Sequence, residues 1–304
     1  MTKFLIIDGN SIGCRAAFAG PKTGDDLKTT TGIETGTIVR FFNIINKVML
    51  QLEPTHIVCC WDTDAHTFRK DLYPEYKANR HNRQSNIDMS TVHRQFAMIR
   101  KMLDILGIKS VNVQKFEGDD LVGSFLAISN ADMNYICSGD KDSWALVNDN
   151  TTAVFPKSGF TDVILATPEY IEDKFMIKRA NYVGLKMLQG DVSDNVKGLE
   201  GCGPKTAAKL LNEFNDIDTI AALTDEDLAG YNKKIRNNFA DWKQRFPILK
   251  ELMTIRTDVQ LPYTFDDCEI DLLNWDEFKI YIKGLEMYNF IQRIEWGAVY
   301  RLKY

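Results

Sequence analysis

Short apolar runs that lead into acidic residues are the feature that most constrains the fold of this chain. Residues 3–7, 56–61 and 133–137 are such runs, and helical patterns at 37–52 and 91–106 lie between them. Strands that alternate with helices predict an α/β fold, in which helices flank a mostly parallel central sheet on both faces. Ligands of such sheets bind at the carboxyl edge of the strands, so this edge is where a functional site is expected.

Acidic residues gather at that predicted edge. Asp8 follows the first run, Asp62 follows the second, and Asp140 and Asp142 follow the third. Three more acids stand within four residues at the start of a helix that is predicted to begin near Gly118. The full set of candidate metal ligands is Asp8, Asp62, Glu117, Asp119, Asp120, Asp140, Asp142, Asp191 and Asp194.

This many carboxylates in one cleft would repel one another unless cations compensated their charge. The six cysteines contain no C-x-x-C pair and the four histidines show no zinc-ligand spacing, so the ligands on offer are hard oxygen atoms. Such ligands suit two or more Mg²⁺ ions, with Mn²⁺ as a substitute. Two divalent ions can activate water on one side of a phosphorus atom and stabilise the leaving oxygen on the other.

Bulk properties set further bounds. No apolar run is long enough to cross a bilayer, and the N-terminal apolar stretch leads directly into Asp8, unlike a signal sequence. We therefore expect a cytoplasmic protein with no membrane partner and with reduced cysteines. The net charge of −5 by itself argues against a nucleic-acid partner.

The distribution of charge reverses that argument. Residues 66–101 carry eight basic against three acidic residues, and Phe68, Tyr73 and Tyr76 stand among the cations. Cations interleaved with aromatic rings suit single-stranded nucleic acid, whose bases stack while its phosphates are neutralised. A solvated basic surface is the plainer alternative for the charges alone.

A glycine-rich segment precedes a second basic region. Gly201 and Gly203 expose backbone amides before a helix that is predicted to start near Pro204, and Lys205 and Lys209 lie close by. This pattern predicts a helix-hairpin-helix, at about 186–214, that grips duplex backbone without reading sequence; a plain helix-turn-helix connection is the alternative. A Walker nucleotide-binding loop is disfavoured because Pro204 stands where that motif requires glycine before the lysine.

The texture of the chain changes near residue 165. Thr167, Pro168 and Glu169 form a helix-start signal, and mostly helical patterns follow. We therefore expect an α/β catalytic domain at 1–165 and a mostly helical region at 166–304.

Six motifs in this order resemble the 5′-nuclease family, which includes phage flap endonucleases, 5′-3′ exonucleases and the 5′-nuclease domain of bacterial DNA polymerase I. The resemblance covers Lys3 to about Phe214. The motifs are Ile7-Asp8-Gly9, Asp62 followed by Phe68-Arg69, Tyr76 to Arg80, Glu117 to Asp120, Ser138 to Asp142, and Gly190 to Ala207. The chain departs from the family at Gly118, where an alanine is common.

The resemblance implies a role for each candidate residue, together with a helical arch at about 66–101 and a helix-three-turn-helix region that often holds K⁺. A first metal would be bound by Asp8, Asp62, Glu117 and Asp119, and a second by Asp140, Asp142 and Asp191, with Asp119 near both and with Asp120 and Asp194 in the outer shell. Lys77 and Arg80 would steady the scissile phosphate, with Lys186 near the site. Substrate-binding candidates are Arg69, Tyr76, Arg83, Lys197, Gly201, Gly203, Lys205, Thr206 and Lys209.

The resemblance also implies a structure-specific 5′-nuclease, acting as a 5′-3′ exonuclease and flap endonuclease that leaves 5′-phosphate and 3′-hydroxyl ends. Expected partners are branched or nicked DNA with a 5′ flap or 5′ end, RNA–DNA hybrid primers and replication-fork proteins. The chain is expected to be a monomer of the free-standing bacteriophage type, since it carries no fused polymerase. The alternatives are a PIN-type ribonuclease and a non-catalytic protein that binds branched DNA.

Overall fold

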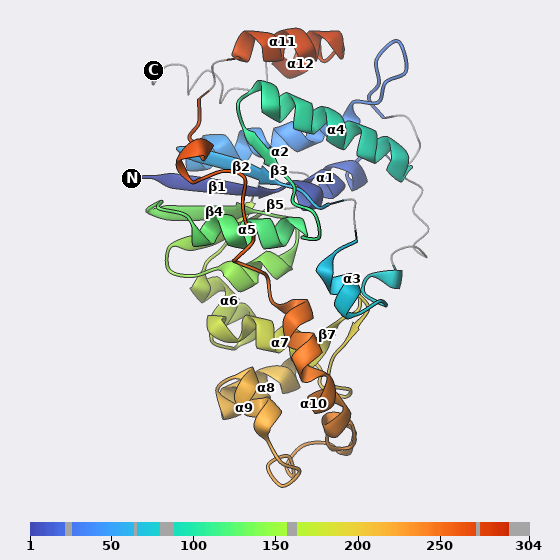
Figure 1. Ribbon diagram of the computed structural model, residues 1–304, viewed down its shortest axis with the longest axis vertical. Helices are drawn as coiled ribbons and strands as arrows, with labels where there is room; N and C mark the ends of the chain where they lie inside the picture. The colour runs from blue at the N-terminus through green and yellow to red at the C-terminus, as the bar shows by residue number, and fades with distance from the viewer. Residues whose placement is uncertain (22–25, 64–65, 80–87, 157–162, 272–273, 292–304) are drawn as a thin grey trace.

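A six-stranded sheet runs through the upper half of the molecule as drawn in Figure 1. The computed structural model describes residues 1–21, 26–63, 66–79, 88–156, 163–271 and 274–291. The strand order is β3-β2-β1-β4-β5-β6, and all neighbours are parallel except β5 and β6. The strands are β1 (Lys3–Asp8), β2 (His56–Cys60), β3 (Lys109–Val111), β4 (Met133–Cys137), β5 (Thr151–Pro156) and β6 (Val163–Ala166). The predicted mostly parallel sheet is thus confirmed.

Helices cover both faces of the sheet because the side chains of its central strand alternate between two cores. Leu5 and Ile7 of β1 pack with helices on one face, whereas Phe4 and Ile6 pack with a helix on the other. The first face is covered by α1 (Gly9–Phe18), α2 (Gly36–Leu52) and α4 (Met89–Ile105), and the second by α5 (Gly118–Ala127).

The register of the central strands brings their carboxyl ends level. Asp8, the last residue of β1, pairs with Cys60 of β2, while its neighbour Ile7 pairs with Cys137 of β4. The residues that follow these three strands therefore meet at one edge, where α1 also begins. This edge carries the acidic residues that the sequence placed there.

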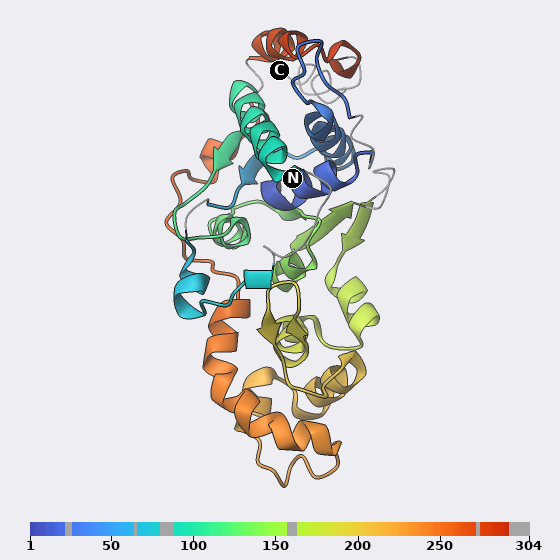
Figure 2. The same ribbon diagram turned by 90° about the vertical axis from the view of Figure 1, so that its right-hand side faces the viewer.

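A second, helical region lies below the sheet and has its own core (Figure 2). Two short strands, β7 (Gly190–Asp191) and β8 (Val196–Lys197), pair between its second and third helices. The backbones of Gly190 and Gly198 are in close contact there. A Cβ on Gly198 would come within 2.3 Å of the Gly190 nitrogen, so glycine is required at position 198. The helices are α6 (Pro168–Phe175), α7 (Tyr182–Gln189), α8 (Pro204–Phe214), α9 (Ile217–Ala222) and α10 (Lys233–Met253).

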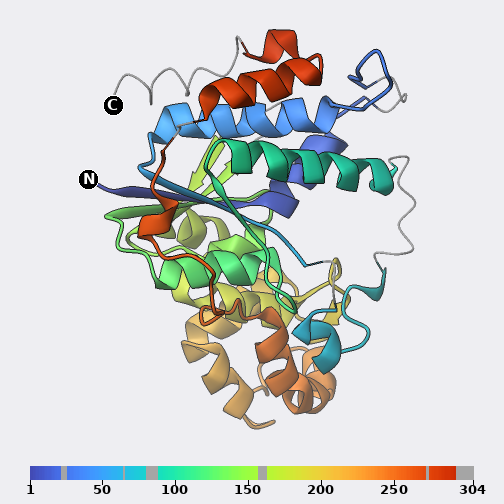
Figure 3. The same cartoon turned by 45° about the horizontal axis from the view of Figure 1, so that its top comes forward.

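After α10 the chain returns to the sheet (Figures 1 and 3). Phe265 packs against Phe4 of β1 with ring centroids 5.3 Å apart. Beyond it, α11 (Trp275–Gly284) and α12 (Tyr288–Ile291) pack on the outer side of α2. The ring centroids of Phe278 and Phe42 are 5.9 Å apart there. In the structure β6 runs to Ala166, and α11 and α12 belong to the core around the sheet; the division near residue 165 stays a prediction.

Within the described residues, every helix is too short or too polar to cross a bilayer. The segment 66–101, in which the arch is expected, contains α3 (Phe68–Leu72) and most of α4, and the arch itself stays a prediction. Arg80 and Arg83, which were expected to contact substrate, lie outside the described residues.

Candidate active site

Asp8 and Asp62 lie at the ends of neighbouring strands and are held by fixed donors. Asp8 accepts hydrogen bonds from the Ser11 backbone amide at 3.0 Å and from the Ser138 hydroxyl at 2.9 Å. Asp62 Oδ1 accepts the Gly118 amide at 2.7 Å, and a Cβ on Gly118 would lie 3.2 Å from that oxygen. Burial raises the pKa of Asp8 to about 7, and the negative charge of Asp62 adds to the shift. Burial and the nearby charge of Asp62 therefore both oppose the ionisation of Asp8 at this edge.

Glu117 and Asp119 enter the same edge from the start of α5. Lys77 Nζ lies 2.7 Å from Glu117 Oε1, and the buried Tyr76 hydroxyl lies 3.1 Å from Glu117 Oε2 and 3.0 Å from Asp194 Oδ2. Burial raises the pKa of Asp119 well above its usual value, although the nearby charge of Arg69 opposes the shift. Among the described residues, the buried Asp119 Oδ1 has no hydrogen-bond partner.

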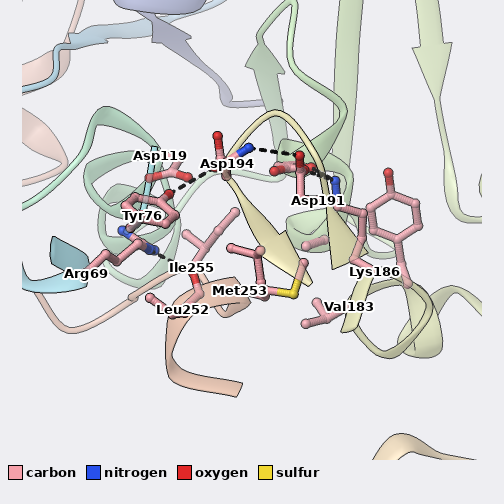
Figure 4. Close-up of a pocket in the computed structure, with 14 residues that line it drawn as sticks. Arg69, Tyr76, Asp119, Val183, Lys186, Asp191, Asp194, Leu252, Met253 and Ile255 are labelled. Atoms are coloured by element: carbon pink, nitrogen blue, oxygen red, sulfur yellow. Dashed lines mark hydrogen bonds and ion pairs between the residues drawn. The ribbon is translucent and has the colours of Figure 1, made fainter. Parts of the chain in front are cut away.

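A second group of carboxylates surrounds Lys186 of α7 (Figure 4). Lys186 Nζ lies 2.7 Å from Asp142 Oδ1 and 2.6 Å from Asp191 Oδ2. Burial opposes the charge of Lys186, but the two carboxylates outweigh it and raise the pKa of this lysine. Burial and the neighbouring Asp140 together raise the pKa of Asp142 to about 6.

The carboxylates fit a divalent cation by their chemistry. Within the described residues, no three of them converge into a ready-made coordination shell. The ammonium groups of Lys77 and Lys186 lie between them instead, and Asp119 Oδ1 has no donor. A buried carboxylate oxygen without a donor, next to acids with raised pKa values, is suited to a hard cation.

Two adjoining cavities contain nearly the whole acidic set. One has a volume of about 1040 Å³ and the other, drawn in Figure 4, about 500 Å³. Asp119 and Asp142 line both cavities and so connect them. The predicted acids on their walls are Asp8, Asp62, Glu117, Asp119, Asp140, Asp142, Asp191 and Asp194.

Asp120 is the predicted acid that lies apart from these cavities. It is fully buried, and its carboxylate is bound by both terminal nitrogens of Arg69, at 2.6 and 2.7 Å. Arg69 is itself only 2% exposed, and it lines the cavity drawn in Figure 4, so its expected contact with substrate stays a prediction. Tyr76 is also buried and lies within the acidic group rather than on an exposed binding face.

The glycine-rich segment forms one wall of a groove of about 1510 Å³. Lys197, Gly201 and Gly203 line it, and Gly201 adopts a φ of +88° that favours glycine. Helix α8 starts at Pro204, and no described side chain caps its N-terminus, so the amides of its first turn have no side-chain partner among the described residues. Lys205 and Lys209 of α8 are exposed, and Thr206 between them is partly buried.

Two further residues of this region were missed from the sequence. Arg245 of α10 lines the groove and donates to the Lys197 carbonyl at 2.9 Å. Asn79 lines the same groove and donates to the Val192 carbonyl at 2.6 Å. Arg245 had no motif to mark it, and Asn79 stands within the motif Tyr76 to Arg80 but was not singled out there, because its partner is distant in sequence.

The acidic cavities are suited to divalent cations, and the groove leads to a helix N-terminus that no described side chain caps. This combination is typical of a protein that binds nucleic acid and hydrolyses phosphodiester bonds. Models of known families match nearly the whole chain. Residues 3–176 match the 5′-3′ exonuclease N-terminal resolvase-like domain, and residues 177–276 match the 5′-3′ exonuclease C-terminal SAM fold. The chain belongs to the 5′-3′ exonuclease family.

Similar proteins agree with this assignment. DNA polymerase I of Bacillus subtilis (strain 168) is 31% identical over 294 residues, which cover 96% of this chain and 32% of that protein. The chain thus spans about a third of the length of the curated relatives it matches.

Solved structures show the same fold. The bacteriophage T5 flap endonuclease, in a complex with DNA and metal ions, aligns with a TM-score of 0.66 at 20% identity and covers 96% of this chain and 99% of that one. The catalytic core of Rad2 in complex with a DNA substrate aligns with a TM-score of 0.59 at 16% identity and covers 93% and 88%.

Proposed function

We propose that this chain is a structure-specific 5′-nuclease that acts as a 5′-3′ exonuclease and flap endonuclease on DNA. The observation that carries the proposal is the pair of adjoining cavities lined by eight of the nine predicted acids. Two of these acids, Asp191 and Asp194, are followed in the sequence by the glycine-rich segment that leads into α8. No described side chain caps the N-terminus of that helix. Cleavage chemistry and a duplex-backbone grip are thereby carried by consecutive parts of one chain.

The acidic residues would hold two or more Mg²⁺ ions, with Mn²⁺ as a substitute. Bound there, the ions would supply Lewis-acid activation of water and stabilise the charge on the leaving oxygen. Lys77 and Arg80 would steady the scissile phosphate, and Lys186 would balance the charge between Asp142 and Asp191. Lys77 Nζ lies 2.7 Å from Glu117, and its ammonium group has three donors, so a phosphate in the cleft would be met by a small shift of this side chain or by another of its donors.

The proposed substrates are branched or nicked DNA with a 5′ flap or 5′ end, and RNA–DNA hybrid primers removed during replication. Support comes from the T5 and Rad2 structures, both of which are complexes with DNA. We further propose K⁺ in the hairpin, replication-fork proteins as partners, a monomeric state and a cytoplasmic location, and we retain a bacteriophage source as a prediction. Six cysteines without a disulfide suit that location.

The proposal is tested with a panel of 5′-flap, nicked and single-stranded DNA and a matching RNA, each incubated with and without Mg²⁺. We expect Mg²⁺-dependent cleavage near the 5′ end of the flap and the nick. Cleavage of RNA alone would instead favour a PIN-type ribonuclease. Tight flap binding without turnover in Mg²⁺ or Mn²⁺ would favour a non-catalytic protein that binds branched DNA.

Metal binding is expected to stabilise the fold more strongly at pH 8 than at pH 5.5. Asp8 has a folded pKa of about 7, above its ordinary value of 3.8, so the metal-free fold loses stability as this group ionises between those values. A divalent cation compensates the ionised form and competes with protons for it. Thermal unfolding with and without Mg²⁺ measures the difference, and an equal Tm increase at both pH values would contradict it.

The double substitution Lys205→Ala and Lys209→Ala is expected to weaken duplex binding regardless of sequence. Both lysines are exposed on the helix that follows the hairpin. Each phosphate contact that is lost should lower the slope of log K against log salt by about 0.9. Fluorescence anisotropy in Ca²⁺ at several salt concentrations gives this slope, and an unchanged slope would remove these lysines from the duplex grip.

A further inference from the structure

Arg69 uses every donor of its guanidinium group inside the protein. An arginine has five N–H donors in a rigid plane. Arg69 Nε donates to the Leu252 carbonyl at 2.9 Å, Nη1 to Asp120 at 2.6 Å and to Glu117 at 3.4 Å, and Nη2 to Asp120 at 2.7 Å and to the Thr254 carbonyl at 3.3 Å. A side chain with all five donors engaged has none left for a substrate phosphate.

The acceptors come from two segments that are far from Arg69 in sequence. Glu117 and Asp120 belong to the start of α5, which also carries Asp119. Leu252 lies in the last turn of α10, and Thr254 follows that helix. Figure 4 shows Arg69 lying between Asp119 and Leu252. The guanidinium therefore joins the segment that carries Lys77, the helix with the metal-site acids, and the last turn of the longest helix in the duplex-binding region.

Asp120 is the carboxylate partner of Arg69 and is itself fully hydrogen-bonded. Besides Arg69, it accepts the Glu117 amide at 3.1 Å and the Arg256 amide at 3.0 Å, so its two oxygens receive four hydrogen bonds. Bidentate pairs of this kind fix orientation as well as charge, which a lysine ammonium does not. We call Arg69, Asp120 and the backbone groups they bind the buried joint.

We infer that Arg69 is a positioning residue, which holds Glu117 and Asp119 in the arrangement that the first metal needs and fixes that arrangement to the end of α10. The inference rests on the proposed metal-dependent function. Glu117 Oε2 is shared between Arg69 Nη1 and the Tyr76 hydroxyl, so the rotation of this carboxylate depends on the joint. Groups that orient metal ligands in this way commonly contribute about 10- to 100-fold to metal affinity.

Arg69→Lys tests the inference, because it keeps the charge and loses the bidentate geometry. The readout is Mn²⁺ binding to the DNA-free protein, measured from the electron paramagnetic resonance signal of free Mn²⁺. We expect affinity at the tightest site to fall about 10- to 100-fold, with the dissociation constant for duplex DNA in Ca²⁺ changed by less than about twofold. Unchanged Mn²⁺ affinity in a folded Arg69→Lys protein would overturn the inference.

Two controls separate positioning from general stability. Ile235→Val removes a methylene from the helical core and lowers stability without touching the joint, so Mn²⁺ affinity should stay at the wild-type value. Lys279→Gln removes a partly exposed cation of α11 whose side chain pairs with Asp276, and it should also leave Mn²⁺ affinity unchanged. A loss in either control equal to that of Arg69→Lys would show that the metal site responds to stability or charge alone.

Asp120→Asn approaches the joint from its other partner and serves if Arg69→Lys does not fold. It keeps the shape of the side chain but weakens the charge-assisted pair, so it should also lower Mn²⁺ affinity; unchanged affinity would again overturn the inference. Mn²⁺ binding by the wild-type protein separates a failure of the proposed metal-dependent function from a failure of the inference about the joint. A wild-type protein that binds no Mn²⁺ would refute the proposed metal-dependent function itself, whereas wild-type binding with unaffected variants would refute only the role of the joint.

Discussion

Asp119→Ala is expected to lower turnover of a 5′-flap substrate by at least about a thousandfold. Asp119 lines both adjoining cavities, and its Oδ1 has no donor among the described residues, so it is placed to serve both proposed metals. Removing a shared ligand should impair activation of water and stabilisation of the leaving oxygen together. Charge stabilisation by such metals is worth several kcal/mol, and each 1.36 kcal/mol is a factor of about ten in rate.

DNA binding should survive this substitution. Removal of a carboxylate reduces repulsion of phosphate, so the dissociation constant for flap DNA in Ca²⁺ should stay the same or fall. Asp194→Ala, which removes a proposed outer-shell group, should cost only about 10- to 100-fold and be partly rescued by Mn²⁺. Asp173→Ala removes an exposed acid of α6 and is the charge-matched control. Near-normal turnover of Asp119→Ala, or an equally inactive Asp194→Ala at saturating metal, would refute this order of ligands.

Lys77→Ala is expected to lower the single-turnover cleavage rate about 100- to 1000-fold, the range found when one donor to a developing negative charge is removed. The lysine reaches into the acidic cleft, where its ammonium lies 2.7 Å from Glu117 and 4.0 Å from Asp194. Its backbone has a φ of +57°, which alanine tolerates no worse than lysine, so the loss should reflect the ammonium group.

Duplex affinity separates this role from simple attraction of DNA. The dissociation constant of Lys77→Ala for flap DNA in Ca²⁺ should stay within about threefold of wild type, because the duplex grip is expected at the hairpin and α8. The matched control is Lys283→Ala, which removes an exposed cation of α11. This helix lies at the end of the molecule away from α8 (Figure 1). Parallel losses of rate and affinity in Lys77→Ala would show that the lysine acts in binding and not on the reacting phosphate.

Much of the fold could be predicted because strong local signals marked its elements. The runs at 3–7 and 133–137 are apolar and border acids, and they form β1 and β4. The three-residue β3 is too short to show a period, and β6 is an antiparallel edge strand whose pairing partner is defined only in three dimensions. The return of the chain after α10 depends on contacts such as Phe265 with Phe4, which separate positions in sequence cannot reveal.

The site divides in the same way. Most of the acids could be found because they stand at or just after the end of a strand or at the start of a helix, whereas Asp194 lies in the turn between β7 and β8. The structure brings eight of the nine onto the walls of two adjoining cavities. The basic residues lack such a signal, because the sequence of a basic segment does not distinguish a buried arginine from an exposed one. Arg69 was named only as a substrate-binding candidate, and its burial and its pair with Asp120 became visible in the structure alone.

The central claim is that the acidic cleft cleaves DNA from its 5′ end with divalent metals, and a time course on one flap substrate tests it most directly. The flap strand carries a 5′ label, and wild type and Asp119→Ala are compared with Mg²⁺ and with EDTA. We predict that wild type releases short labelled products only with Mg²⁺, that the remaining strand gains a 5′-phosphate at the cut, and that Asp119→Ala releases almost none. Cleavage in EDTA, shortening from the 3′ end first, or equal activity of the two proteins would contradict the claim.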